Sequence, residues 1–449
     1  MPQPHLTHRL PGLVGALLAS AVLLSRPALA DNLLDDYLAA TRHEPTFAAA
    51  QMQSQNMRVD ARAAAAAYLP RAGVSLSQDA YDNATRRTVR LVQPVFSADR
   101  WLNVQESTPR EAIAEHLQAL SRYNLAGRVF SAVRDYTAAR EKLTLYEGNL
   151  TALQAQHESA RMAHQLGQGT ITDVLDTQVR VAQARALIQR AGAELDTARR
   201  QYANVTGHMP STGAYPLSTR HLPAQALPAL EDQIAKVMQA HPGMLAERRA
   251  TEISAISARR ARAQFMPSVN ATWQRSQTGS NTPNTINGMV LSLDVPLQYS
   301  SRYAFDTADN NLVAQQQKER ATEAELTLET QRMHALAQAA QQEVSISREA
   351  IEAAEMGLAA NEQSFDGGVR TKLDVLNALQ ALLSAKEAHL SAQLVLAESL
   401  LGLRLLAASD IPATLQHIQQ LFFGPVLCHA GDTSPPTGAD SAARRTGCR

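Results

Sequence analysis

A heptad pattern of apolar residues, sustained over long segments, is the feature that most constrains the fold. Before residue 165 the apolar side chains stand alternately four and three residues apart, at Leu125, Val129, Ala132, Tyr136, Ala139, Leu143, Tyr146, Leu150 and Leu153. Two further segments, from Val174 to Val205 and from Met333 to Leu358, keep the same step. A period of about 3.5 residues is typical of supercoiled helices that pack along a seam. We therefore predict very long paired helices, the first spanning about 100 Å from near Ser97 to Gln165.

Two glycine-bearing breaks interrupt these segments at corresponding places. The first is Gly167–Asp176 and the second is Gly367–Asn377, and each continues with threonine, aspartate and a Val-Leu pair. Glycine at the end of a helix followed by a capping residue is typical of a turn between helices. The two turns are therefore predicted at the same end of two parallel helical hairpins.

The spacing of prolines indicates that the chain is duplicated. Pro45 and Pro242 are separated by the same number of residues as Pro70 and Pro267. Pro70 and Pro267 each follow a predicted helix. After each such helix come two short segments in which apolar and polar residues alternate, beginning near Val74, Val89, Val269 and Leu291. Alternation of this kind predicts strands, and a repeat at this spacing predicts two copies of one unit.

The predicted fold class is mainly α with a small β part, and five parts follow along the chain. They are a signal peptide (1–30), a first repeat (31–207), a linker (208–228), a second repeat (229–409) and a C-terminal tail (410–449). Thr108-Pro109 within the first long helix predicts a fresh helix start, because the Thr-x-x-Glu pattern reaches Glu111. A kink is expected there.

The N-terminus has the pattern of an export signal. His8 and Arg9 precede the apolar run from Leu10 to Leu24, and Ala28-Leu29-Ala30 fits a signal-peptidase site. The run is too short to span about 30 Å of hydrocarbon. We therefore expect cleavage after Ala30 and an exported mature chain.

The tail is expected to be disordered and dispensable, because it is polar and rich in proline and glycine. Leu421-Phe422-Phe423 is its exception, since this apolar run could pack against the helices. Cys428 and Cys448 could form a disulfide in an oxidising compartment, although nothing near them needs a cross-link.

Composition and motifs exclude several classes of function. Lys+Arg and Asp+Glu both number 42, which leaves no basic excess for nucleic acid. His157-Glu158 and His43-Glu44 lack the second histidine of a zinc protease, and Gly167-x-Gly169 lacks a third glycine and a preceding strand. No catalytic set, metal site or cofactor site is predicted.

Four amphipathic strands per chain are too few to close a barrel in lipid, where an open sheet leaves backbone groups without partners. Three copies of the chain would supply twelve strands and resolve this. The alternative is a soluble platform in a periplasmic coiled-coil scaffold or adaptor protein.

Several motifs together resemble the TolC family of outer-membrane exit ducts. They are the Leu-Pro and Met-Pro helix ends, the strand ends Gln93–Phe96 and Val295–Leu297, and the two glycine turns, each in two ordered copies from about Leu33 to Leu406. The resemblance implies a homotrimer in the outer membrane, with a twelve-strand β-barrel continued by a twelve-helix α-barrel across the periplasm. It also implies docking to an inner-membrane ABC transporter or pump through a periplasmic adaptor, contact with outer-membrane lipid, and no catalysis.

The resemblance also assigns roles at the turns. Arg370 matches the arginine that helps to close the periplasmic tip, with Thr172 and Asp173 as expected partners and Asp176 as a further one. Asp374 matches an acidic ring of the lumen. The family's second ring falls on Asn377 and its gate tyrosine on Phe365, so a weaker constriction and a looser gate are expected.

Plainer readings stay open for these residues. Asp173 and Asp374 could be helix caps only, and Arg370 could be a solvated turn charge. Trp273 is expected at the lipid interface, whereas Trp101 could be a packing residue. A polypeptide toxin is the expected cargo of a type I secretion duct, with small-molecule efflux as the alternative.

Overall fold

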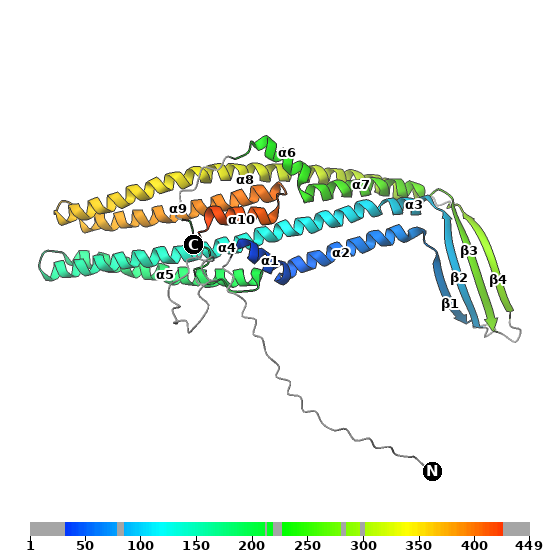
Figure 1. Ribbon diagram of the computed structural model, residues 1–449, viewed down its shortest axis with the longest axis horizontal. Coiled ribbons are helices and arrows are strands. Elements are labelled where there is room, and N and C mark those ends of the chain that lie inside the picture. Colours follow the sequence, from blue (N-terminus) through cyan, green and yellow to red (C-terminus); the bar gives the residue numbers. More distant parts are fainter. Residues whose placement is uncertain are drawn as a thin grey trace, which may run out of the picture.

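Two hairpins of very long helices dominate the structure, a computed structural model that describes residues 32–78, 85–211, 213–218, 227–279, 284–296 and 301–424 (Figure 1). The first hairpin joins α4 (Ser107–Gln165) to α5 (Ile171–Thr206), and the second joins α8 (Ser301–Asp366) to α9 (Lys372–Leu406). With 59 residues α4 extends about 90 Å, and α8 with 66 residues extends about 100 Å. Both turns lie at the end opposite the sheet. The fold class predicted from the heptads is confirmed.

Shorter helices connect the sheet to the rest of each half of the chain. They are α1 (Leu33–His43), α2 (Pro45–Ala65), the 3₁₀ turn η1 (Ala66–Tyr68) and α3 (Ala98–Gln105) in the first half, with α6 (Leu230–Ala240) and α7 (Pro242–Ala263) in the second. Pro45 and Pro242 stand at the first position of α2 and α7, where a missing N–H costs nothing. The side chains of Glu44 and His241 cap these two helices by accepting backbone N–H groups.

The expected break in the first long helix is present, but it lies slightly earlier than Thr108. α3 ends at Gln105 and α4 begins at Ser107, with Glu106 between them. Glu106 is fully buried, and its carboxylate accepts from Arg110 at 2.5 Å and from the Ser257 hydroxyl at 3.1 Å. These contacts with α4 and α7 fix the break at Glu106.

The four strands form one antiparallel sheet in the order β1-β2-β3-β4. Their bounds are β1 (Arg71–Gln78), β2 (Thr85–Phe96), β3 (Ser268–Gly279) and β4 (Asn284–Asp294). The two halves of the chain therefore meet at the central pair, β2 with β3. A register shift between Pro94 and Phe96 accommodates the proline in β2, which cannot donate a ladder hydrogen bond.

Alternation along the strands gives the sheet two different faces. We call the first the apolar face, because most of its side chains are Val74, Leu76, Val89, Leu91, Val269, Ala271, Trp273, Met289, Leu291 and Leu293. The second, the polar face, carries Ser75, Ser77, Thr88, Arg90, Asn270, Thr272, Gln274, Ser276 and Ser292. On the polar face the hydroxyls of Thr88 and Ser276 lie 3.2 Å apart and both residues are buried.

The main core lies where the short helices pack around the middle of the long ones. It joins buried residues of α1, α4, α5 and α9 with Tyr215 in the segment after α5. Asp36 of α1 is buried in it and accepts hydrogen bonds from the hydroxyls of Tyr202 and Tyr215. Arg140 of α4 donates to the backbone carbonyls of Ala214 and Tyr215, which holds this segment against the helices.

The expectation of a disordered tail from residue 410 is wrong for its first part. Residues Ile411–Phe422 form helix α10, capped by the side chain of Asp410, which accepts from the Ala413 N–H at 3.0 Å. One face of α10 is buried in the main core, where its apolar side chains contact α9 and α1. Phe423 forms a bridge with Leu217, and the Gly424 N–H donates to the Pro216 carbonyl at 2.8 Å.

Several expectations fall on residues outside the described ones: the signal peptide with its cleavage site at Ala30, part of the linker (residue 212 and residues 219–226), and the tail from residue 425 with Cys428 and Cys448. Among the helices that the structure describes, none combines the length and the apolar character needed to cross a membrane.

Candidate functional site

The two hairpin turns are built in the same way. Gly167 and Gly368 both have φ of 73°, a left-handed conformation that favours glycine, and each ends a long helix. Thr170 and Thr371 then begin the next helix, each accepting the N–H of an aspartate three residues later, while that aspartate accepts the threonine N–H. Asp173 and Asp374 therefore complete capping boxes.

Arg370 lies in the second turn, two residues before the start of α9. Its guanidinium is 57% exposed and stands 3.9 Å from a carboxylate oxygen of Asp374. Within the described part of this single chain, no hydrogen bond or ion pair joins Arg370 to the first turn, where the Thr172 hydroxyl instead lies 2.7 Å from that of Thr170. A bond between turns in the closed trimer stays a prediction.

The predicted lumen residues, Asp374 and Asn377, lie on the first two turns of α9, and the predicted gate residue Asp176 lies at the corresponding place on α5. Hydrogen bonds from the Thr371 N–H and hydroxyl lower the pKa of Asp374 below its usual range, and Arg370 adds to this. Asn377 and Asp176 are exposed one helical turn beyond their capping aspartates. Asp374 is thus the residue of this group that is best held in its charged form.

Lys372 is the residue at the tip that sequence reasoning missed. It is the first residue of α9, yet only 5% of it is exposed. Its ammonium donates to the Gln156 side-chain oxygen on α4 and lies 4.7 Å from the centre of the Phe365 ring. Burial lowers the pKa of Lys372, against the opposing effect of Asp173, Asp366 and Glu362. This side chain links the second hairpin to the first.

The link at Lys372 predicts an unequal effect of removing its two ends. Gln156→Ala leaves a buried ammonium without that acceptor, at a cost of about 1–3 kcal/mol, whereas Lys372→Met removes the charge and keeps the apolar stem. Hydrogen exchange of peptides covering the two turns should therefore accelerate more in Gln156→Ala. In the Lys372→Met background, Gln156→Ala should add little, and an additive effect would contradict the link.

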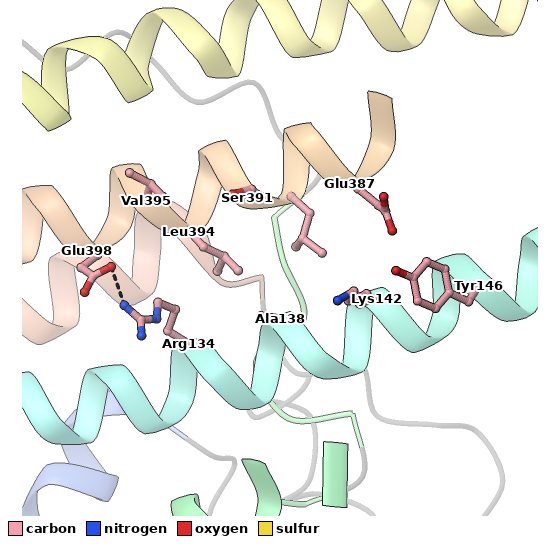
Figure 2. A pocket seen from close by; sticks show the side chains of 10 residues that line it. Arg134, Ala138, Lys142, Tyr146, Glu387, Ser391, Leu394, Val395 and Glu398 are labelled. Carbon is pink, nitrogen blue, oxygen red and sulfur yellow. Dashed lines mark ion pairs between the residues drawn. The ribbon is translucent and has the colours of Figure 1, made fainter. Parts of the chain in front are cut away.

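A groove of about 490 Å³ runs between the hairpins, lined by α4 and α9 (Figure 2). Arg134 forms ion pairs there with Glu398 across the groove and with Asp135 at 2.8 Å. At its other end, burial and the carboxylate of Glu387 raise the pKa of Tyr146. The groove has charged groups of both signs, Arg134 and Lys142 on α4 and Glu387 and Glu398 on α9.

Trp273 lies on the apolar face of the sheet, as predicted, opposite Leu91 of β2 and Met289 of β4. It is 41% exposed in the single chain. Trp101 is 55% exposed on α3, so its contacts within the chain are few. Among the described residues, no group of three or more His, Cys, Asp or Glu side chains is placed to hold a metal ion.

Comparison with known proteins decides the family. The model of the family described as "Outer membrane efflux protein" matches residues 37–208 and 234–409, which cover most of the chain and lie in both of its halves. The chain belongs to the outer membrane efflux protein family. Expected membership of the TolC family is thereby confirmed, and with it location in the outer membrane, spanning into the periplasm.

Individual relatives of this outer membrane efflux protein agree in length as well as in sequence. The outer membrane efflux protein BepC of Brucella suis is 24% identical over 404 residues, covering 84% of this chain and 85% of BepC. The alkaline protease secretion protein AprF of Pseudomonas aeruginosa is 24% identical over 402 residues, covering 83% of each. The crystal structure of VceC from Vibrio cholerae superposes with a TM-score of 0.72 at 16% identity, covering 84% of this chain and 96% of VceC.

Proposed function

We propose that this protein is the outer-membrane exit duct of a type I secretion system and exports a polypeptide. Members of the family are channels that assemble as homotrimers and work with an adaptor and an inner-membrane transporter. The observation that carries the finer proposal is the full-length similarity to AprF, whose name assigns it to protease secretion. The sequence as a whole also resembles the cyclolysin secretion member of the family, which favours a toxin of the RTX type as cargo.

A small-molecule efflux duct is the second candidate. The similarity to BepC, which is named an efflux protein, supports it equally in identity and coverage. A passive lumen needs no substrate-specific chemistry, and the groove and turn residues described above offer none. The two functions therefore differ in the transporter and adaptor that dock at the tip.

Deletion of the gene in its source bacterium separates the two. The proposal expects the loss of one or more polypeptides from the culture medium, restored by a plasmid copy, with unchanged susceptibility to dyes and antibiotics. Retained protein export together with increased susceptibility would replace the proposal with the efflux candidate.

Arg370→Ser is expected to raise the single-channel conductance of the purified trimer in a planar bilayer. The guanidinium is exposed, and among the described residues its one ion pair is a long contact to Asp374, so it is available for the other hairpin's turn. A charged hydrogen bond contributes about 1.5–3 kcal/mol, less where water screens it, and the trimer has three copies. Wild-type conductance in Arg370→Ser would indicate a solvated turn charge instead.

Asp374→Asn is expected to weaken the cation preference of the channel and its block by multivalent cations. The carboxylate is partly exposed and its pKa is lowered by the Thr371 hydrogen bonds. Because the pKa is lowered, the wild-type channel should keep its cation preference as the pH falls, and should lose it only when the pH is below the usual pKa of aspartate. Asp176→Asn, on the other hairpin, is the matched control. Reversal potentials in a salt gradient measure the ion selectivity of both variants. Equal values for Asp374→Asn and wild type would contradict the lumen role.

A further inference from the structure

Two arginines stand on the apolar face of the sheet, near its Thr85 and Gly279 end, where Gln277 and Asn287 are also polar. In the register of β2 and β3, Val89 lies opposite Arg275 and Arg87 lies opposite Gln277. Arg87 and Arg275 therefore occupy diagonal positions on the same face, with side chains about 7 Å apart at their bases. Both residues are exposed. Because β2 and β3 are the central strands, one chain supplies the whole pair.

The position of the pair along the strands places it at one edge of the membrane. The helices join the sheet at its Phe96 and Ser268 end, and the arginines lie toward the opposite end. Since the long helices extend into the periplasm, that opposite end is the outer one. Arg275 lies two residues beyond Trp273, an aromatic residue of the kind that marks the lipid interface.

Among the residues that the structure describes, the positive charge of the pair has no ion-pair partner. Along the described strands, no aspartate or glutamate occupies the apolar face. The described residues form no ion pair with Arg87 or Arg275, whereas Arg90 on the polar face donates to Gln274 at 3.3 Å. Like charges at diagonal positions repel each other, so an anion between them would offset both.

We propose that Arg87 and Arg275 bind the phosphate of a phosphorylated lipid headgroup in the outer leaflet. Two guanidinium groups present paired donors that match phosphate oxygens, and Trp273 can pack against the acyl chains below. The lipid is favoured over a free anion because the site lies on the face that meets lipid in a barrel of this family. One site per chain gives three in the trimer. The inference rests on the barrel fold and is independent of the cargo.

Native mass spectrometry of the delipidated trimer tests the site, with diphosphorylated lipid A as the probe. Wild type should bind up to three molecules with saturable affinity. The double variant Arg87→Gln/Arg275→Gln should bind at least about tenfold more weakly, because each charged hydrogen bond contributes about that factor. Arg86→Gln is the matched control, since Arg86 is the neighbouring arginine on the opposite face and should be dispensable.

Unchanged affinity in the double variant would overturn the proposal, as would equal binding of lipid A that lacks phosphate or an equal loss in Arg86→Gln. Competition by millimolar inorganic phosphate would assign the site to a free anion and overturn its lipid identity. If the double glutamine variant does not form heat-modifiable trimers, Arg87→Lys/Arg275→Lys decides. It keeps the charge and loses the paired donors, so affinity equal to wild type would also contradict the site.

Discussion

Truncation after Ser409 is expected to abolish the folded, heat-modifiable trimer. The cut removes α10, whose buried residues Ile411, Leu415, Ile418 and Phe422 belong to the main core. Burying an apolar side chain of this size contributes about 1.5–3 kcal/mol, so four contribute roughly 6–12 kcal/mol as an upper bound. That is comparable to the whole stability of a typical domain, about 5–15 kcal/mol. The effect should therefore be loss of assembly.

A second truncation, after Gly424, is the matched control. It keeps α10, the bridge between Leu217 and Phe423, and the bond from the Gly424 N–H to the Pro216 carbonyl. Trimers with a wild-type melting temperature are expected. The single substitution Leu415→Ala, at a fully buried position, should lower stability by about 2–5 kcal/mol. Stable trimers after the Ser409 cut would show that α10 is an accessory to the core.

Local patterns in the sequence predict the parts of this fold that depend on local geometry. Heptad spacing identifies α4, α5 and α8, because a seam between two helices requires the same periodicity along its whole length, and the second glycine turn identifies α9 as the partner of α8. Alternation identifies the four strands for a similar reason. The pairing of β2 with β3 joins distant parts of the chain, and only the packing of the two repeats determines it.

Helix α10 was missed although its signal is present. Ile411, Leu415, Ile418 and Phe422 have helical spacing after a capping Asp410 and a proline at the start of the helix. Residues 425–449 are rich in proline, glycine, serine and threonine, and this composition outweighs the helical spacing when the tail is taken as one segment. Averaging over a long segment concealed a short amphipathic helix at its beginning.

The turn residues were identified by sequence, but not their contacts. The positions of Gly167, Gly368 and the capping aspartates follow from the chemistry of helix ends. Lys372 gives no such signal, because a lysine in the first turn of a helix is usually solvated. Its burial arises from the approach of α4, which carries Gln156. Contacts between hairpins depend on tertiary packing and cannot be found from local spacing.

Asp36→Ala is expected to lower the stability of the chain by roughly 3–6 kcal/mol. The Asp36 carboxylate, 2% exposed, accepts hydrogen bonds from the hydroxyls of Tyr202 and Tyr215, and each bond to a charged group contributes about 1.5–3 kcal/mol. His208 adds a contact at 3.3 Å. These bonds join α1 to the end of α5 and to the segment after it. Thermal unfolding of the detergent-solubilised trimer measures the loss.

Asp35→Ala is the control for this network, because Asp35 is the neighbouring acid in the first turn of α1 and is partly exposed. Its loss should cost about 0.3–1 kcal/mol, the typical value for an acid near a helix N-terminus. Tyr215→Phe removes one donor to the carboxylate and keeps the hydroxyl of Tyr202 and the contact with His208. Because these groups share one network, Asp36→Ala combined with Tyr215→Phe should cost less than the sum of the single changes. Additive losses would mean that the buried carboxylate and the tyrosine stabilise the core independently.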